Sequence, residues 1–134
     1  MGQWRDGSGT LTVEPDGGAA GGAAVPLEIA ASYGTRRRGL LGRDGVAGAL
    51  LLTPCAGVHT FGMRFAIDVA YLDRRLRVLA VQTLRPGRLP RPRLRARHVL
   101  EAEAGAMAGW GLRAGAVVRV EAGGAAGAGA AGRG

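Results

Sequence analysis

The residues with the most chemical potential in this chain lie close together, between positions 55 and 68. Within fourteen residues the segment holds a thiol, an imidazole, a guanidinium and a carboxylate, in Cys55, His59, Arg64 and Asp68. A thiol beside an imidazole that a carboxylate orients can act as a nucleophile, and the thiol, imidazole and carboxylate are also metal ligands. Sequence spacing alone does not show that these side chains meet in space, either as a catalytic pair or as metal ligands. We therefore predict no catalytic residue, no metal site and no cofactor. An enzyme that uses Cys55 and His59 is the alternative.

The same segment has the composition of a binding site. Phe61 and Met63 place apolar side chains beside the polar groups of His59, Arg64 and Asp68. Ligand pockets combine apolar walls with a few polar groups, and binding residues concentrate on irregular chain. The main hypothesis is therefore a non-enzymatic module that binds a small molecule or a protein partner here. For Arg64 and Asp68 the alternative is a structural role, in which an ion pair or hydrogen bonds between the carboxylate and the backbone fix the loop.

Two more binding candidates lie on a basic segment upstream. The stretch YGTRRRGLLGR follows Ser32, a suitable N-cap, and predicts a short helix over 33–43 that Gly42 and Gly45 end. Residues seven apart share one face of a helix. Arg36 and Arg43 are thus expected to lie side by side, where they could hold an acidic group.

The chain is strongly basic, and its longest basic stretch is rich in proline. The formal net charge is +8 and all 18 basic residues are arginine, which predicts attraction to polyanions at low salt. Arg85–Arg97 holds six arginines and three prolines, and the prolines exclude a helix or a central strand, so an exposed loop is expected. Nucleic-acid readers usually pair such charge with aromatic side chains, and this loop has none. Polyanion binding through Arg85–Arg97 is a second, less favoured alternative, and the arginine excess also fits a codon bias shared with alanine and glycine.

Alternating and apolar runs predict the elements that must position these residues. Short strands are expected at 11–13, 25–31, 48–53, 67–72, 76–81, 98–104 and 116–121, with a hairpin turn at 73–75 and a helical piece or turn near 106–111. The fold class is α+β, mostly β: a compact curled antiparallel-rich sheet or small barrel of about six or seven short strands with one or two short helices.

The length and composition limit the organisation of the chain. The 134 residues suit one domain, expected over 1–121, and the Gly/Ala-rich residues 122–134 are expected to be a disordered tail. No run of about 18 apolar residues could cross a membrane, and the first residues lack the apolar segment of a secretory signal. We therefore expect a soluble, cytoplasmic protein.

Three linked motifs resemble the domain of unknown function 192 family. A segment like E-R-x-x-G-L-M-x-R is matched by Arg36, Gly39, Leu40 and Arg43. An F-W-M-K-N-T-like loop leading into a P-[IL]-D strand is matched by Phe61, Met63, Arg64 and Asp68, and an L-E-x-x-x-G element by Leu100, Glu101 and Gly105.

The resemblance covers 25–120 and departs from the family pattern at three positions. Gly62 stands where tryptophan is usual, Leu41 replaces methionine, and Ala116 lies where Gly-Asp is common. Loss of the tryptophan would change the shape and aromatic character of a pocket beneath the loop. The family implies a compact, mostly β domain with one or two short helices, and it implies no established reaction.

Overall fold

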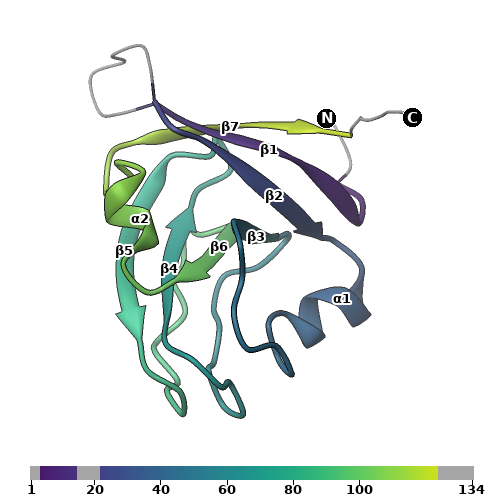
Figure 1. The fold of residues 1–134 in the computed structure, drawn as a ribbon. Coiled ribbons are helices and arrows are strands. Elements are labelled where there is room, and N and C mark those ends of the chain that lie inside the picture. The colour runs from purple at the N-terminus through teal and green to yellow at the C-terminus, as the bar shows by residue number, and fades with distance from the viewer. Residues whose placement is uncertain (1–3, 15–21, 124–134) are drawn as a thin grey trace.

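The fold is one curled sheet of seven strands with two short helices (Figure 1). The computed structural model describes residues 4–14 and 22–123. In chain order the elements are β1 (Gly7–Glu14), β2 (Ala24–Ala30), α1 (Tyr33–Arg38), β3 (Ala49–Leu52), β4 (Ile67–Leu72), β5 (Val78–Leu84), β6 (His98–Glu103), α2 (Ala106–Gly109) and β7 (Val117–Ala122). The predicted mostly β, α+β class is confirmed.

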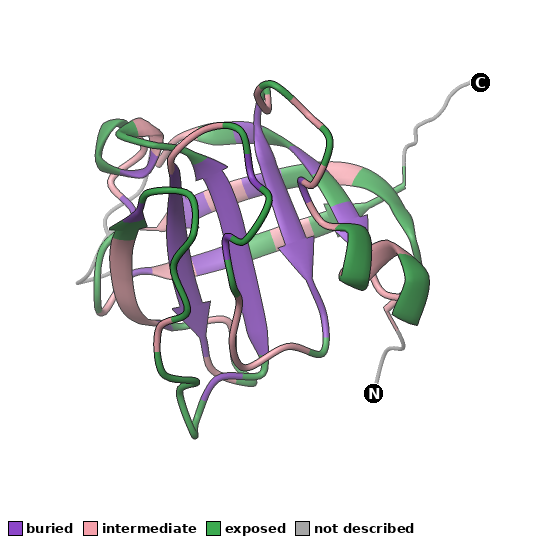
Figure 2. Cartoon of the chain, turned by 90° about the horizontal axis from the view of Figure 1, so that it is seen from below, coloured by how far each residue is buried: buried purple, intermediate pink, exposed green. Residues whose placement is uncertain are grey.

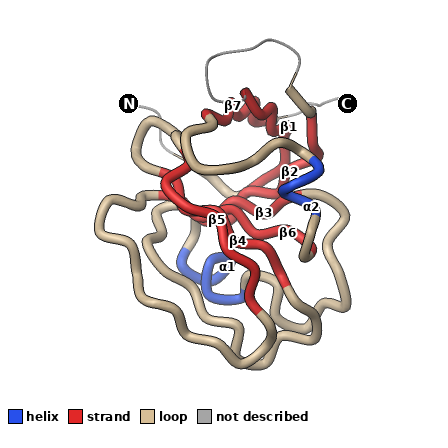
Figure 3. Tube along the Cα trace, turned by 90° about the vertical axis from the view of Figure 1, so that its left-hand side faces the viewer, coloured by secondary structure: helices blue, strands red, loops and turns tan. Residues whose placement is uncertain are grey.

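The strand order explains why α1 lies on the sheet. The order is β5-β4-β6-β3-β2-β1-β7, and every neighbouring pair is antiparallel except β2 with β3, which are parallel. Parallel strands cannot be joined by a tight turn, so residues 31–48 cross over one face of the sheet and carry α1 with them. Figure 3 shows α1 and the long loops on the side of the sheet away from β1 and β7.

The sheet curls far enough to bring its two edge strands together. An isolated antiparallel bridge joins Arg77, just before β5, to Val117 at the start of β7. The arrangement is a half-barrel with a concave inner face and a convex outer face.

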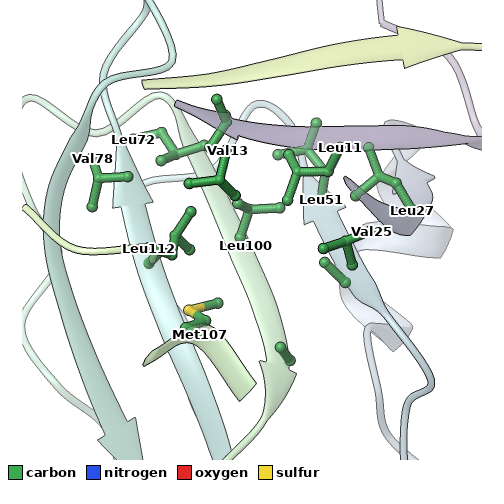
Figure 4. Packing of buried hydrophobic residues seen from close by; sticks show 14 of the residues in the cluster. Leu11, Val13, Val25, Leu27, Leu51, Leu72, Val78, Leu100, Met107 and Leu112 are labelled. Carbon is green, nitrogen blue, oxygen red and sulfur yellow. The ribbon is translucent and has the colours of Figure 1, made fainter. Parts of the chain in front are cut away.

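Both faces of the central strands are buried, because each face has its own apolar cluster. On the inner face Leu11 and Val13 of β1 point toward Leu72, Leu100 and the residues near α2 (Figure 4). The outer cluster includes Leu40, Leu50, Leu52, Val69 and Val99, and the crossover and the loops at 53–66 and 85–97 cover it. Figure 2 shows the resulting buried strands surrounded by exposed loops.

The helix α1 is shorter than predicted. Ser32 is its N-cap as expected, with its side-chain oxygen accepting a hydrogen bond from the Thr35 N–H. The helix ends at Arg38 rather than near Gly42, because Gly39 adopts φ 50°, a conformation that suits glycine, and donates its N–H to the Thr35 carbonyl. None of the residues of α1 is buried.

An N-terminal carboxylate fastens α1 to the sheet. Asp6, directly before β1, accepts hydrogen bonds from the backbone N–H groups of Ala31 and Ser32, at 2.6 and 2.8 Å, and from the Thr35 hydroxyl at 2.7 Å. These contacts join residues about 25 positions apart in the sequence. They anchor the start of a helix that has no apolar face of its own.

The remaining sequence predictions concern the chain ends and membranes. Ala122 belongs to β7, and Gly123 donates its backbone N–H to the Ser8 carbonyl, so the predicted tail begins no earlier than 124. Residues 1–3, 15–21 and 124–134 lie outside the described residues. In the two described ranges, no helix is long and apolar enough to cross a membrane.

Candidate functional site

A pocket of about 190 Å³ opens on the outer face of the sheet, between α1 and the segment 55–63. Its base comes from neighbouring strands, with Leu52 from β3 and Glu101 from β6. Its rim comes from the three consecutive arginines at the end of α1, and its remaining wall from the segment that begins at Cys55 and ends at Met63. We call this the outer pocket. The crossover between β2 and β3 holds the rim over the base.

Glu101 at the base of the outer pocket is a buried acid without a hydrogen-bonding partner in the part of the chain that the structure describes. Only 6% of its surface is exposed. Among the residues that the structure describes, none donates a hydrogen bond to its carboxyl group, and burial alone raises the pKa of Glu101 to about 7. A buried charge normally has a partner, because removing it from water is costly. Near neutral pH this group therefore exchanges between a neutral form and an uncompensated charge.

The backbone at the end of α1 lies against Glu101. A Cβ atom added to Gly39 would come within 3.8 Å of the carboxyl oxygen Oε1 of Glu101. Gly39 also has the positive φ that ends the helix. The glycine of the first motif and the glutamate of the third thus lie together at the base of the outer pocket.

The rim of the outer pocket is positively charged. Arg36 donates hydrogen bonds to the Pro54 carbonyl at 2.8 Å and to the Ser32 carbonyl at 3.4 Å, so it joins α1 to the opposite wall. Arg37 and Arg38 are exposed, and no acidic side chain in the described ranges forms a salt bridge with any of the three. A positive rim therefore surrounds an acidic base.

Cys55 and His59 line one wall of the outer pocket without forming a catalytic pair. The Cys55 thiol donates a hydrogen bond to the Gly57 carbonyl at 3.0 Å, and burial raises its pKa. His59 accepts a hydrogen bond at Nδ1 from the Phe61 N–H and stacks on the Phe61 ring, with the centroids 5.2 Å apart. The reactive thiolate is disfavoured, and the acceptor nitrogen of the imidazole is occupied.

The other predicted site residues lie elsewhere. Met63 lines the outer pocket and Phe61 is exposed beside it, but Arg64 points outward and forms an exposed salt bridge with Asp44 at 3.1 Å. Arg43 pairs with Glu28 at 2.9 Å beside a different hollow. The prediction that Arg36 and Arg43 share a helical face is wrong, because α1 ends five residues before Arg43.

Asp68 lies on the opposite face of the sheet from the outer pocket. Side chains alternate along β4, so Asp68 shares the inner face with Ala70 and Leu72. It accepts hydrogen bonds from the Thr83 hydroxyl at 2.6 Å and from the backbone N–H groups of Gly105 and Met107 at 2.9 and 3.1 Å. These are the carboxylate-to-backbone bonds of the structural interpretation, and they tie β4 to the start of α2.

Glu101 is the site residue that the sequence prediction left out. It appears there only as part of the L-E-x-x-x-G motif. The available signal was a carboxylate within the apolar run HVLEA, because an acidic residue is rarely buried in a strand without a functional or structural reason.

Comparison with known proteins gives a consistent family assignment. The model of the domain of unknown function 192 family, described as uncharacterised, matches residues 16–120. The UPF0127 protein PH1112 of Pyrococcus horikoshii is 34% identical over 84 residues, which cover 59% of this chain and 73% of the relative.

Two solved structures share the fold. One is a protein of unknown function from Novosphingobium aromaticivorans, with a TM-score of 0.70 and 20% identity, covering 82% of this chain and 83% of the other. The second, from Sinorhizobium meliloti and named as a candidate transcription regulator, has a TM-score of 0.73 and 15% identity, covering 89% of this chain and 98% of the other. At these identities the likeness concerns the fold alone.

Proposed function

The chain belongs to the domain of unknown function 192 family, and from the geometry of the outer pocket we propose that it is a non-enzymatic module that binds a small molecule there. The observation that carries the proposal is Glu101, an acid that is 6% exposed, has no donor among the described residues and lines the pocket. A buried, unsatisfied carboxyl group costs stability. Such groups cluster at functional sites, where a ligand can complete the missing contacts.

The shape of the outer pocket favours a small ligand over a protein partner. Its volume of about 190 Å³ lies below the roughly 300–1,000 Å³ typical of pockets for drug-sized molecules. Leu52 at the base and Val58 and Met63 on the wall are apolar, whereas the guanidinium groups lie at the rim and the carboxyl group at the base. This combination suits a molecule with a short apolar body and polar ends.

The contacts of Cys55 support binding rather than thiol chemistry. A thiol that burial keeps protonated is a poor nucleophile, and the Cys55 hydrogen bond goes to a backbone carbonyl rather than to His59. We therefore assign the side chains of Cys55 and His59 to the wall of the binding site.

A screen against matched variants tests the proposal. Ligand-observed NMR with a library of small polar metabolites is expected to give hits on the native protein, and Val58→Phe, which fills the outer pocket, is expected to abolish them. Val46→Phe is the control, because Val46 is a half-buried valine that packs on the same apolar cluster and does not line the pocket. Hits that survive Val58→Phe, or a library without hits, would refute a small-molecule site here.

A further inference from the structure

The charges of the outer pocket are arranged in a fixed order along its depth. Three arginines stand at the rim and a carboxyl group lies at the base, and the wall between them carries the apolar Val58 and Met63 together with Cys55 and His59. Arg36 is engaged with two backbone carbonyls, and Arg37 and Arg38 are exposed. Within the described residues, none of the three rim arginines forms a salt bridge with Glu101, so the positive rim and the acidic base do not neutralise each other.

We propose that the outer pocket recognises a small zwitterion, with a protonated amine that donates hydrogen bonds to Glu101 and an acidic group, a carboxylate or a phosphate, that faces the arginines of the rim. This inference rests on the proposed function and names the class of ligand. A charged donor and a carboxylate form one of the stronger hydrogen bonds in proteins, and arginine is well shaped for an anionic oxygen pair. Within the described residues Glu101, Arg37 and Arg38 have no oppositely charged partner, so each end of such a ligand meets an uncompensated group.

A ligand with a single charge matches this order less well. A simple amine must pass three arginines on a protein with a net charge of +8. A simple anion is attracted to the rim, but it brings nothing to satisfy Glu101. Because opposite charges attract more strongly where water is excluded, the amine contributes most at the buried end of the pocket.

Proton exchange gives an independent readout of the contact with Glu101. Burial raises the pKa of Glu101 to about 7, so at pH 6 most of the free protein carries a neutral Glu101. An ammonium group favours the charged carboxylate, and binding at pH 6 therefore releases protons. The titratable groups that face the site are Arg36, Arg37 and Arg38 on α1, Cys55 and His59 on the wall, and Tyr71 on β4.

A comparison of five compounds tests the ligand class. The probes are 6-aminohexanoate, hexanoate, hexylamine and 1-hexanol, titrated into the native protein by calorimetry at pH 8, with 4-aminobutyrate as a shorter zwitterion. We expect one of the two zwitterions to bind at least tenfold more tightly than each singly charged or neutral compound. At pH 6, titration in two buffers with different ionisation enthalpies is expected to reveal proton release.

Variants assign each end of the ligand. Glu101→Gln is expected to remove the tenfold higher affinity of the zwitterion relative to hexanoate and to abolish proton release. The double variant Arg37→Gln/Arg38→Gln is expected to remove the higher affinity of the zwitterion relative to hexylamine. Glu103→Gln, an exposed change on the same strand, is expected to leave all affinities unchanged. Proton release that persists in Glu101→Gln would assign it to another group, such as His59, and would contradict the contact.

The outcomes separate this inference from the proposed function. If hexanoate or hexanol binds as tightly as the zwitterions, the ligand class is overturned and the small-molecule pocket stands. The same conclusion follows if the metabolite screen gives pocket-dependent hits that are not zwitterions. An absence of binding by all five compounds together with an empty screen would overturn both.

Discussion

Two buried carboxylates show how strongly the surroundings of a residue determine its role. Asp68 and Glu101 are 3% and 6% exposed, on opposite faces of adjacent strands. Asp68 accepts three hydrogen bonds, whereas Glu101 accepts none from the residues that the structure describes. A satisfied acid contributes to stability, and an unsatisfied one reduces it. The first therefore supports the fold, and the second is available for a ligand.

Glu101→Gln is expected to stabilise the protein in a pH-dependent way. The folded pKa of about 7 exceeds the ordinary value of 4.5, so the folded state binds the extra proton between these values. The contribution of protonated Glu101 to the stability of the folded state is fully present below pH 4.5 and is lost as the pH rises through 7. The gain in unfolding free energy from the substitution should be about 2–3 kcal/mol larger at pH 8 than at pH 5.

Urea unfolding at the two pH values measures this difference. Glu103→Gln, on the exposed end of the same strand, provides the comparison. A Glu101→Gln gain that is equal at pH 5 and pH 8 would show that Glu101 does not titrate between them.

At the scale of elements, α1 depends on contacts outside itself. It has six residues, none of them buried, and isolated helices of that length are unstable in water. Hydrogen bonds to Asp6 hold the pKa of its carboxyl group well below its usual range. The bond from the Ser32 N–H has the largest effect, and those from the Thr35 hydroxyl and the Ala31 N–H come next. Asp6 therefore stays charged in mild acid and keeps the start of the helix in place. Since α1 carries the rim arginines, Asp6 positions the rim of the outer pocket without touching it.

Asp6→Ala is expected to loosen α1 and to weaken binding in the outer pocket. The Arg36 and Gly39 amides, which donate to the Ser32 and Thr35 carbonyls, should exchange with deuterium at least tenfold faster, and the amides of β4 and β6 should be unaffected. Hydrogen exchange followed by NMR measures this directly. Asp44→Ala, which removes only an exposed ion pair with Arg64, is the control, and equal exchange in the two variants would contradict the role of Asp6.

The elements with strong local patterns were predictable from the sequence. The apolar run at 67–72 matches β4, and the hairpin turn at 73–75 joins β4 to β5 as expected. The parallel pairing of β2 with β3 was not predictable, because it depends on strands separated by a crossover rather than on local periodicity. The sequence pattern does not predict the early end of α1, because the apolar Leu40 and Leu41 after Gly39 suit a continued helix, whereas Gly39 is its C-cap.

The candidate site was only partly predictable, for a related reason. His59 and Met63 lie near each other on irregular chain and line the outer pocket, and Arg36 lines it from α1. Asp68 was grouped with them by sequence proximity, but strand alternation sends its side chain to the inner face. Glu101 is distant in the sequence and reaches the site through the pairing of β6 with β3. Proximity along the chain located the wall of the pocket, and the sheet supplies its base.

For the whole molecule, the charge distribution is uneven. The nine arginines between 74 and 97 are all exposed, and no acid lies between Asp73 and Glu101. Most of them belong to the loop before β6, on which Leu89 and Leu94 are also exposed. We expect this surface to attract polyanions through charge alone, because the loop has no aromatic platform for bases.

Nucleic-acid binding is expected to be weak, unselective and sensitive to salt. Affinities for duplex DNA and single-stranded RNA, measured by fluorescence anisotropy, should each fall at least tenfold between about 50 and 200 mM salt, because binding releases counterions. Arg88→Gln, Arg91→Gln and Arg95→Gln together should reduce the slope of affinity against salt. A sequence preference that survives about 150 mM salt would instead identify this loop as a specific nucleic-acid site.

The separation of the two apolar clusters by one sheet has an evolutionary consequence. Neighbouring residues of β6 serve different faces: Leu100 and Ala102 pack in the inner cluster, whereas Val99 packs in the outer cluster and Glu101 opens into the pocket. Substitutions in the crossover and in the 55–63 segment can therefore alter the rim and the wall while the inner cluster keeps its packing. We therefore expect relatives that share this half-barrel to vary more in the residues of the rim and the wall than in those of the inner cluster.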